Sequence, residues 1–163
     1  MDELHVRLPA ATWYPTDDRG IPTGSKSVSG SDRDLRELRP IGGLVLDTAF
    51  SGLERAADGT ASVLVCRPDG PSTELWMDDQ YRFVELFTGD SLSDAARRRR
   101  SLGVEPMTAA PNAFRSGDGL ITLDPGQRHR ATWAFRIPSQ PLRYSGRLMK
   151  GSEAGALVAR IAW

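Results

Sequence analysis

The sequence is poor in the side chains that most often bind metals or cross-link a chain. It contains one cysteine, Cys66, and two histidines, His5 and His129. A single cysteine cannot form an internal disulfide or a cysteine-rich zinc site, and the histidines lie far apart on different predicted strands. We therefore expect no metal site, and we expect Cys66 to be buried within its apolar run. A solvated His5, and a His129 at the rim of its strand with one hydrogen bond, account for the histidines.

Neither a long apolar run nor an excess of one charge is present. No stretch is long enough to span a bilayer, and the first residues lack the basic and apolar regions of a signal peptide. The 21 basic and 21 acidic residues give a formal net charge of zero. That balance gives no electrostatic reason to expect nucleic acid or a membrane as a partner. Phosphate-binding glycine loops and serine-nucleophile motifs are also missing. A cytoplasmic protein with one main domain is the simplest expectation.

What is present is a series of short apolar runs separated by turn residues, which predicts an all-β sandwich or barrel. Alternation of apolar and polar side chains is the pattern of a strand with one buried face. The predicted strands cover residues 4–8, 62–66, 73–77, 82–88, 120–124 and 129–137. The second and third flank a turn containing Asp69-Gly70, which predicts a hairpin.

Two segments depart from this rhythm. Residues 94–100 have the composition of one or two helical turns, but four consecutive arginines repel one another, so we expect a solvated loop over 97–100. The tail after Ile137 lacks strand alternation, and Ser152 precedes an alanine-rich stretch that predicts a short C-terminal helix up to Ile161. We therefore divide the chain into a domain over residues 1–137 and an appended tail over 138–163.

Two carboxylates stand in otherwise apolar segments. Asp47 lies within the largely apolar residues 44–50, and a buried carboxylate needs internal hydrogen bonds or a polar ligand. Glu105 precedes Pro106, which favours an extended backbone and helps to stiffen the segment. A stiff, extended segment suits a side chain that meets a substrate at a fixed geometry. On pattern alone, a strand end or a turn explains either carboxylate more simply than a binding site does.

Taken together, these segments resemble the aldose 1-epimerase family over most of residues 4–137. The matching segments, in the family's order, are Leu8-Pro9-Ala10, Ile21-Pro22-Thr23-Gly24, Asp34-Leu35-Arg36, Leu46-Asp47-Thr48-Ala49-Phe50, Leu86-Phe87-Thr88-Gly89-Asp90, Val104-Glu105-Pro106-Met107 through Pro111-Asn112-Ala113-Phe114, and Leu123-Asp124-Pro125-Gly126. Arg33 and Asn112 replace an aromatic residue and an aspartate that are common in the family. Each segment alone is weakly specific, whereas seven segments in order point to the family.

The resemblance implies an antiparallel β-sandwich of the galactose mutarotase-like supersandwich type. It implies an isomerase that interconverts the α and β anomers of hexoses such as galactose or glucose by acid–base ring opening. By the same resemblance, Glu105 corresponds to the general base and Asp47 to a carboxylate that binds sugar hydroxyls. This chemistry requires no cofactor and no metal.

The resemblance also leaves part of the family's site unassigned. The family's histidines belong to the half that precedes this chain's first residue, so no acid role passes to His5 or His129. We therefore expect a sandwich that is incomplete at its N-terminus, and a partner chain that supplies the missing strands is one way to complete it. Without the acid, we expect activity to be lower by roughly 10²–10⁴-fold. The alternatives are a non-catalytic carbohydrate-binding or regulatory sandwich and a structural remnant that binds nothing.

Overall fold

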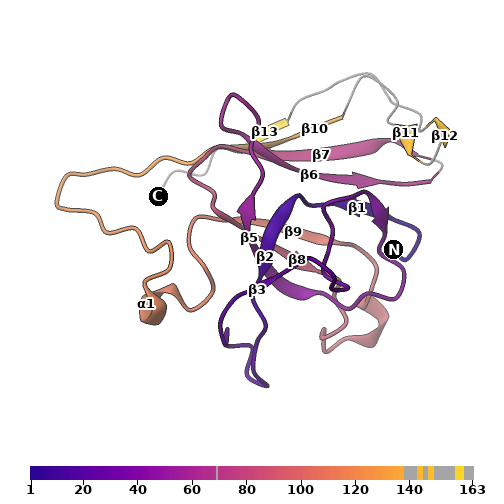
Figure 1. Ribbon diagram of the computed structural model, residues 1–163, viewed down its shortest axis with the longest axis horizontal. Coiled ribbons are helices and arrows are strands. Elements are labelled where there is room, and N and C mark those ends of the chain that lie inside the picture. The colour runs from indigo at the N-terminus through magenta and orange to yellow at the C-terminus, as the bar shows by residue number, and fades with distance from the viewer. Residues whose placement is uncertain (69, 138–142, 145–146, 149–156, 160–163) are drawn as a thin grey trace.

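The protein folds into two antiparallel β-sheets packed face to face (Figure 1). The computed structural model describes residues 1–68, 70–137, 143–144, 147–148 and 157–159, with side chains described up to residue 137. The six-stranded sheet has the order β13 (Leu157–Ala159), β10 (Trp133–Arg136), β7 (Ser72–Met77), β6 (Ala61–Cys66), β1 (His5–Arg7) and β4 (Arg39–Pro40). The five-stranded sheet has the order β3 (Lys26–Ser27), β2 (Ala10–Trp13), β5 (Asp47–Leu53), β8 (Phe83–Phe87) and β9 (Gly103–Met107). A separate pair joins β11 (Arg143–Tyr144) to β12 (Arg147–Leu148).

The all-β, antiparallel sandwich predicted from the sequence is confirmed. The predicted hairpin is β6–β7, whose register runs from Cys66 opposite Ser72 to Ala61 opposite Met77. Asp69 of its turn lies outside the described residues. The predicted strands at 4–8 and 82–88 correspond to β1 and β8. Val6 and Val84, one from each strand, are fully buried.

The core lies between the two sheets and draws side chains from both. Its members alternate along the strands with outward-facing residues, as a period of two requires. The buried cluster contains Val6, Leu8, Ala10, Val28, Leu35, Ile41, Leu46, Phe50, Ala61, Val63, Leu75, Met77, Tyr81, Val84 and Leu86. Phe50 is one of its largest fully buried members. Because one face of the five-stranded sheet is committed to this core, the opposite face is free to carry polar side chains.

Three predictions about the C-terminal third are wrong. Residues 120–124 form no strand, and Leu120, Ile121 and Leu123 are exposed. The last predicted strand is shorter, because β10 begins only at Trp133. Residues 157–159, placed in the predicted helix, form β13, whose backbone pairs with the edge of β10. That pairing satisfies backbone groups that an edge strand would leave open, and this gain overrides local helix propensity. The remainder of the predicted helix lies outside the described residues.

The arginine-rich segment is more ordered than its charge predicts. Residues Ala95–Arg97 form a short 3₁₀ helix (η1), and the Asp94 carboxylate accepts a hydrogen bond from the Ala96 N–H at its start. Arg98 donates to the Leu92 carbonyl oxygen. The solvated side chains expected over 97–100 are correct for Arg97, Arg98 and Arg100, which are exposed. The expectation is wrong for Arg99, which is half-buried and donates to acceptors in other parts of the chain. The only other helix among the described residues is α1 (Ala113–Ser116).

Within the part of the chain that the structure describes, no helix is both long enough and apolar enough to cross a membrane.

Candidate functional site

Three carboxylates lie on the outer face of the five-stranded sheet. Ala49 of β5 pairs with Glu85 of β8, which in turn pairs with Glu105 of β9. Paired residues in an antiparallel sheet point to the same face, and so do residues two apart along one strand. Asp47, two residues before Ala49, therefore shares this face. The two site residues predicted from the sequence are brought to one surface, with Glu85 between them.

The spacing of these carboxylates follows from sheet geometry. Asp47 and Glu105 are two strands apart and offset by two residues. Strand spacings of about 4.8 Å and a rise of about 3.4 Å per residue separate their α-carbons by roughly 12 Å. Side chains that extend toward each other across this span can hydrogen-bond to opposite ends of one small polar ring.

Glu85 has an environment unlike that of the other two carboxylates. It is half-buried, whereas Asp47 and Glu105 are exposed. Burial raises the pKa of Glu85 most, followed by the hydrogen bond with Asp47 and the negative charges of Asp47 and Glu105, and together they bring its pKa from 4.5 to about 7. A pKa raised this far favours the protonated form of Glu85, and in that form its carboxyl group can donate to a neighbouring carboxylate.

A small cavity of about 120 Å³ opens over this part of the sheet. Asp47, Ala49 and Glu85 form its floor. Its other lining residues come from the segment after β2 and from the segment after β9: Tyr14, Thr16, Gly20, Pro22 and Pro111. The cavity is thus built from four parts of the chain that are distant in sequence.

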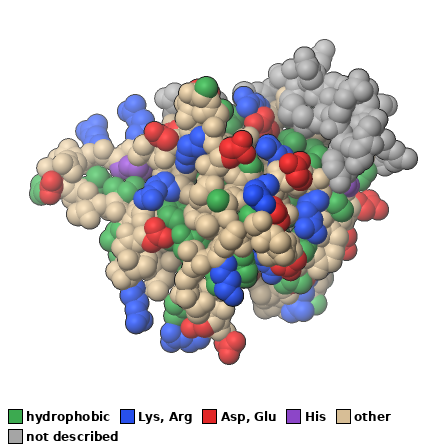
Figure 2. Space-filling view, viewed as in Figure 1, with side chains coloured by type: hydrophobic (Ala, Val, Ile, Leu, Met, Phe, Trp, Pro, Cys, Tyr) green, Lys and Arg blue, Asp and Glu red, His purple; other side chains and the backbone are tan. Residues whose placement is uncertain are grey.

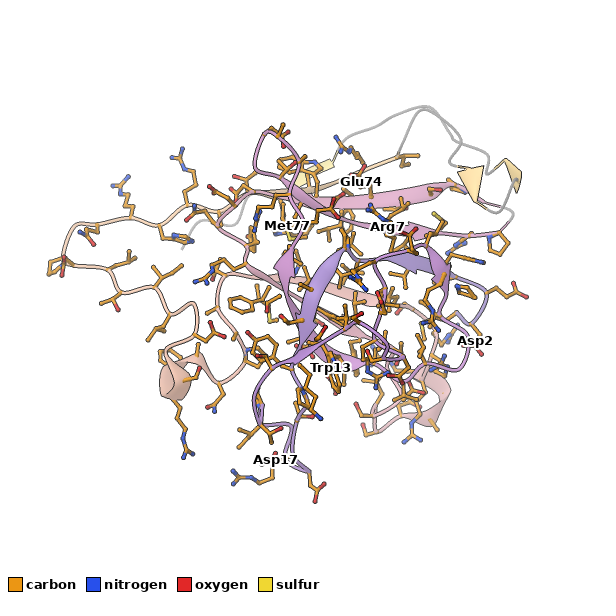
Figure 3. All side chains as sticks on the ribbon, in the orientation of Figure 1. Asp2, Arg7, Trp13, Asp17, Glu74 and Met77 are labelled. Atoms are coloured by element: carbon orange, nitrogen blue, oxygen red, sulfur yellow. The ribbon has the colours of Figure 1, made fainter. Side chains whose placement is uncertain are left out.

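The segment after β2 owes its shape to one aspartate. The Asp17 carboxylate oxygen Oδ1 accepts hydrogen bonds from the backbone N–H groups of Arg19 and Ile21, both at 2.9 Å. Thr16 and Pro22 form an isolated antiparallel bridge across the base of the turn. Asp17 itself lies near the tip of the loop, away from the two sheets (Figure 3). These bonds fix Pro22, and with it one wall of the cavity.

The start of β5, and hence Asp47, is fixed by contacts with the end of β8. The Leu46 N–H donates to the Thr88 hydroxyl at 2.9 Å, and that hydroxyl also contacts the Asp90 carboxylate. The pKa of Asp90 is lowered, mainly by the hydrogen bond with Thr88 and further by Arg99. Thr88 is fully buried, so its polar bonds are shielded from competing water.

The Arg99 side chain connects the start of β5 to the end of β8 and to the start of the chain. Its guanidinium contacts both Asp90 carboxylate oxygens at 3.0 Å and the Asp2 carboxylate at 2.7 Å. It also donates to the carbonyl oxygens of Gly42 (2.6 Å) and Leu44 (3.0 Å), in the segment that leads into β5. Arg99 has a positive φ of 51°, a rare conformation outside glycine. One side chain thus joins the chain's start, the approach to β5 and the end of β8.

Glu105 sits on the edge strand of its sheet. Among the strands that the structure describes, β9 pairs with β8 alone, and Pro106 faces Val84 in that pairing. Proline lacks an N–H, so an edge strand is where a sheet tolerates it. The extended backbone that the sequence predicted around Glu105 is present over Gly103–Met107.

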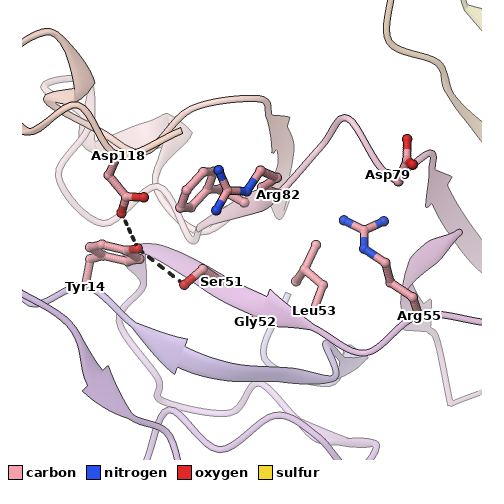
Figure 4. Close-up of a pocket in the computed structure, with 9 residues that line it drawn as sticks. Tyr14, Ser51, Gly52, Leu53, Arg55, Asp79, Arg82 and Asp118 are labelled. Atoms are coloured by element: carbon pink, nitrogen blue, oxygen red, sulfur yellow. Dashed lines mark hydrogen bonds between the residues drawn. The ribbon is translucent and has the colours of Figure 1, made fainter. Parts of the chain in front are cut away.

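A second hollow of about 360 Å³ lies further along β5 on the same face (Figure 4). There the Tyr14 hydroxyl donates to the Asp118 carboxylate at 2.7 Å, and the Ser51 hydroxyl lies 3.3 Å from the Tyr14 oxygen. The pKa of Tyr14 is raised, first by burial. Figure 4 shows these contacts joining β2, β5 and the segment that contains Asp118. They hold the segment after β9 over the sheet.

The remaining residues singled out from the sequence lie elsewhere. Cys66 is fully buried, as predicted, and burial raises the pKa of its thiol. The His5 ring nitrogen Nδ1 lies 3.1 Å from the Glu3 carbonyl oxygen. The His129 Nε2 atom is buried without a hydrogen-bond partner among the described residues, so the single bond expected there is not seen at that atom. Among those residues, no group of three or more His, Cys, Asp and Glu side chains could hold a metal ion.

On the face shown in Figure 2, basic and acidic side chains are interspersed over the described surface. Positive and negative side chains are thus mixed on this face, in keeping with the zero formal net charge.

Comparison with known proteins identifies the family. The family model for aldose 1-epimerase matches residues 1–136. The chain belongs to the aldose 1-epimerase family. Its fold agrees: it superposes on a candidate aldose 1-epimerase from Escherichia coli K12 with a TM-score of 0.62 at 16% identity, over 83% of this chain and 44% of that one. A GalM/aldose epimerase homologue from C. elegans gives a TM-score of 0.66 at 17% identity, over 82% of this chain and 45% of that one.

Among curated proteins, this aldose 1-epimerase family member is 29% identical to the uncharacterized protein YihR of Escherichia coli (strain K12) over 130 residues. The match covers 80% of this chain and 39% of YihR. The chain therefore spans less than half the length of the relatives it matches.

Sequence reasoning missed Glu85 as a member of the carboxylate group. The sequence does show a charge between Phe83 and Phe87 on one face of a predicted strand. A charge between two large apolar side chains on the same face could have marked it. That Asp47 and Glu105 lie beside Glu85 follows only from the register of β8 with β5 and β9.

Proposed function

We propose that this protein is the part of an aldose 1-epimerase-type isomerase that carries the base and one substrate-binding carboxylate. The substrate class is a hexose such as galactose or glucose. The observation that supports this most is that Asp47 and Glu105 share the outer sheet face inside the region that matches the family. Residues with these roles must reach one sugar ring at the same time, and that arrangement permits it.

In this proposal, Glu105 acts as the general base. Its carboxylate takes the proton of the hydroxyl on the anomeric carbon, the carbon–oxygen bond of the ring breaks, and the ring oxygen takes up a proton. The open-chain aldehyde rotates about the adjacent carbon–carbon bond and closes again, and the hydroxyl then lies on either side. Glu105 suits this role because it is exposed on a stiff edge strand and free to meet a ligand. The donor of the ring-oxygen proton is left unassigned.

Asp47 contributes binding rather than bond breaking. A carboxylate accepts two or more hydrogen bonds from sugar hydroxyls, and its charge strengthens each of them. Its position on the cavity floor, opposite Glu105 across β8, lets it hold the far side of the ring while the anomeric hydroxyl meets the base.

The test separates catalysis from binding. Exchange NMR measures the interconversion of the anomers of D-galactose and D-glucose with the 163-residue chain, and ligand-observed NMR measures binding in the same samples. We expect Glu105→Gln to lower the protein-dependent exchange rate by roughly 10²-fold or more and to leave binding in place. We expect Asp47→Asn to weaken binding. Glu37→Gln, at an exposed site away from the carboxylates, serves as the matched control.

Two results would oppose the proposal. Unchanged exchange in Glu105→Gln shows that the base is misassigned. Sugar binding with no protein-dependent exchange in the unmodified chain favours the non-catalytic carbohydrate-binding alternative.

A further inference from the structure

Glu85 lies between the two carboxylates to which the proposed function gives roles, yet that function leaves it without one. It faces Ala49 on β5 and Glu105 on β9, and it shares the floor of the 120 Å³ cavity with Asp47. Asp47, two residues before Ala49 on the same face, is near enough that hydrogen bonding with it is among the causes that raise the pKa of Glu85. Two ionised carboxylates offer only acceptors, so a bond between them requires a proton on one partner.

The surroundings determine which partner holds the proton. The ionisable groups that face Glu85 are Asp47 from β5, Glu105 from β9 and the Tyr14 hydroxyl at the cavity wall. The described lining of this cavity includes no Lys, Arg or His. Glu85 is half-buried whereas Asp47 is exposed, so the proton belongs on Glu85 and the charge on Asp47. The pKa of Glu85, raised to about 7, agrees with this placement.

We propose that Glu85 is a positioning residue, which donates a hydrogen bond to Asp47 through its carboxyl proton and so holds the Asp47 carboxylate in place to accept bonds from a sugar. This rests on the proposed function, because it takes Asp47 to be the sugar-binding group. Glu85 keeps one Asp47 oxygen occupied and leaves the other free for a hydroxyl. When Glu85 releases its proton to solvent, two adjacent negative charges repel each other and the hydrogen bond is lost.

The consequence is a sugar affinity that depends on pH. If only the protonated pair binds, the apparent dissociation constant scales inversely with the protonated fraction. With a midpoint near pH 7, that fraction is about ten times smaller at pH 8 than at pH 6. D-Galactose should therefore bind about tenfold more weakly at pH 8 than at pH 6.

The experiment has a titration arm and a binding arm, both on the 163-residue chain. In the first, ¹³C-carboxyl NMR of glutamate-labelled protein follows Glu85, assigned by its loss in Glu85→Gln. We expect a midpoint near 7 that moves to lower pH in Asp47→Asn. In the second, dissociation constants for D-galactose and D-glucose are measured at pH 6 and pH 8. The dissociation constant at pH 8 divided by that at pH 6 should fall from about ten in the unmodified chain to about one in Glu85→Gln, because the glutamine amide donates at both pH values. Glu37→Gln should keep a ratio of about ten.

The outcomes separate the inference from the function on which it rests. Three results overturn the positioning role while sugar binding stands. They are a titration midpoint of Glu85 near pH 4.5, a midpoint that does not move in Asp47→Asn, and a tenfold difference in dissociation constant between pH 6 and pH 8 that persists in Glu85→Gln. A midpoint near 7 that responds to Asp47→Asn, with no sugar bound at either pH, keeps the shared proton but overturns the proposed function and the role given to the pair.

Discussion

Replacing Glu85 with glutamine should stabilise the fold at alkaline pH and have little effect at acid pH. The folded protein holds the pKa of Glu85 near 7, against 4.5 in an unfolded chain. Between these values the folded state binds more protons than the unfolded state, so stability falls as pH rises from about 4.5 to 7. Well below pH 4.5 the carboxyl is protonated in both states, and about one pH unit above 7 the loss is nearly complete. Glutamine cannot ionise, so the variant avoids this loss.

The size of the effect follows from the same two pKa values. Their difference corresponds to roughly 3 kcal/mol for a fully shielded group. Glu85 keeps substantial contact with solvent, and screening reduces that to roughly 1–2 kcal/mol. For a protein of this length, each kcal/mol shifts the melting temperature by about 2–4 °C, so we expect a gain of roughly 2–8 °C at pH 8.5.

Thermal and urea unfolding, followed by circular dichroism at pH 4 and pH 8.5, measures this gain. The quantity to compare is the stability of Glu85→Gln minus that of the unmodified protein at each pH. Glu37→Gln should show no such change between the two pH values. A difference for Glu85→Gln that is equal at pH 4 and pH 8.5 would refute the reasoning, because it would show that Glu85 titrates normally in the folded state.

Three further predictions concern the framework of the site. Arg99→Met should lower the free energy of unfolding by about 1–3 kcal/mol in urea titrations, because it leaves carbonyls and carboxylates without their donor. Gly119→Ala should cost about 1 kcal/mol or more in the same assay, since φ is +71° and a Cβ would lie 2.6 Å from the Phe83 ring. Cys66 should react with a thiol reagent much more slowly in the folded protein than in urea, because burial shields it and raises its pKa.

Each of these has a control or a contradicting result. Arg19→Met, which removes an exposed ion pair with Asp17, should cost under about 0.5 kcal/mol. If Arg99→Met lowers the free energy of unfolding by no more than Arg19→Met does, the hydrogen bonds of Arg99 stabilise the fold no more than an exposed ion pair. A neutral Gly119→Ala would mean that the segment after β9 can move away from Phe83. Equal Cys66 reactivity in the folded and unfolded protein would place its thiol at the surface.

Local patterns sufficed where the structure is local. The β6–β7 hairpin follows from two apolar runs around a turn, and the alternation over 82–88 predicts the strand that the structure shows as β8. Asp47 and Glu105 were noticed because a charge in an apolar stretch, and a carboxylate before a proline, can be recognised without any knowledge of the fold. The roles proposed for Asp47 and Glu105 rest on the resemblance to the family, since the spacing of the residues alone favours no function.

The misses share a dependence on partners that are distant in sequence. Arg99 belongs to a run of four arginines whose like charges predict mutual repulsion. Its partner Asp2 is 97 residues away in the sequence but in contact with it in the fold. Residues 157–159 are helical by propensity but pair with β10. Glu85 acquires its unusual pKa only when strand pairing places it beside two other carboxylates. The sequence indicates which residues alternate between the two faces of a strand. The register between strands determines which side chains come into contact.

The central claim is that a hexose binds the outer face of the five-stranded sheet over Asp47, Glu85 and Glu105. A titration of the ¹⁵N-labelled chain with D-galactose at pH 6, followed by amide chemical shifts, tests it most directly. The account predicts saturable shifts at those three residues and at Ala49, with the six-stranded sheet unchanged. Shifts that cluster on the six-stranded sheet, or saturable binding that leaves the three carboxylate positions unperturbed, would contradict it.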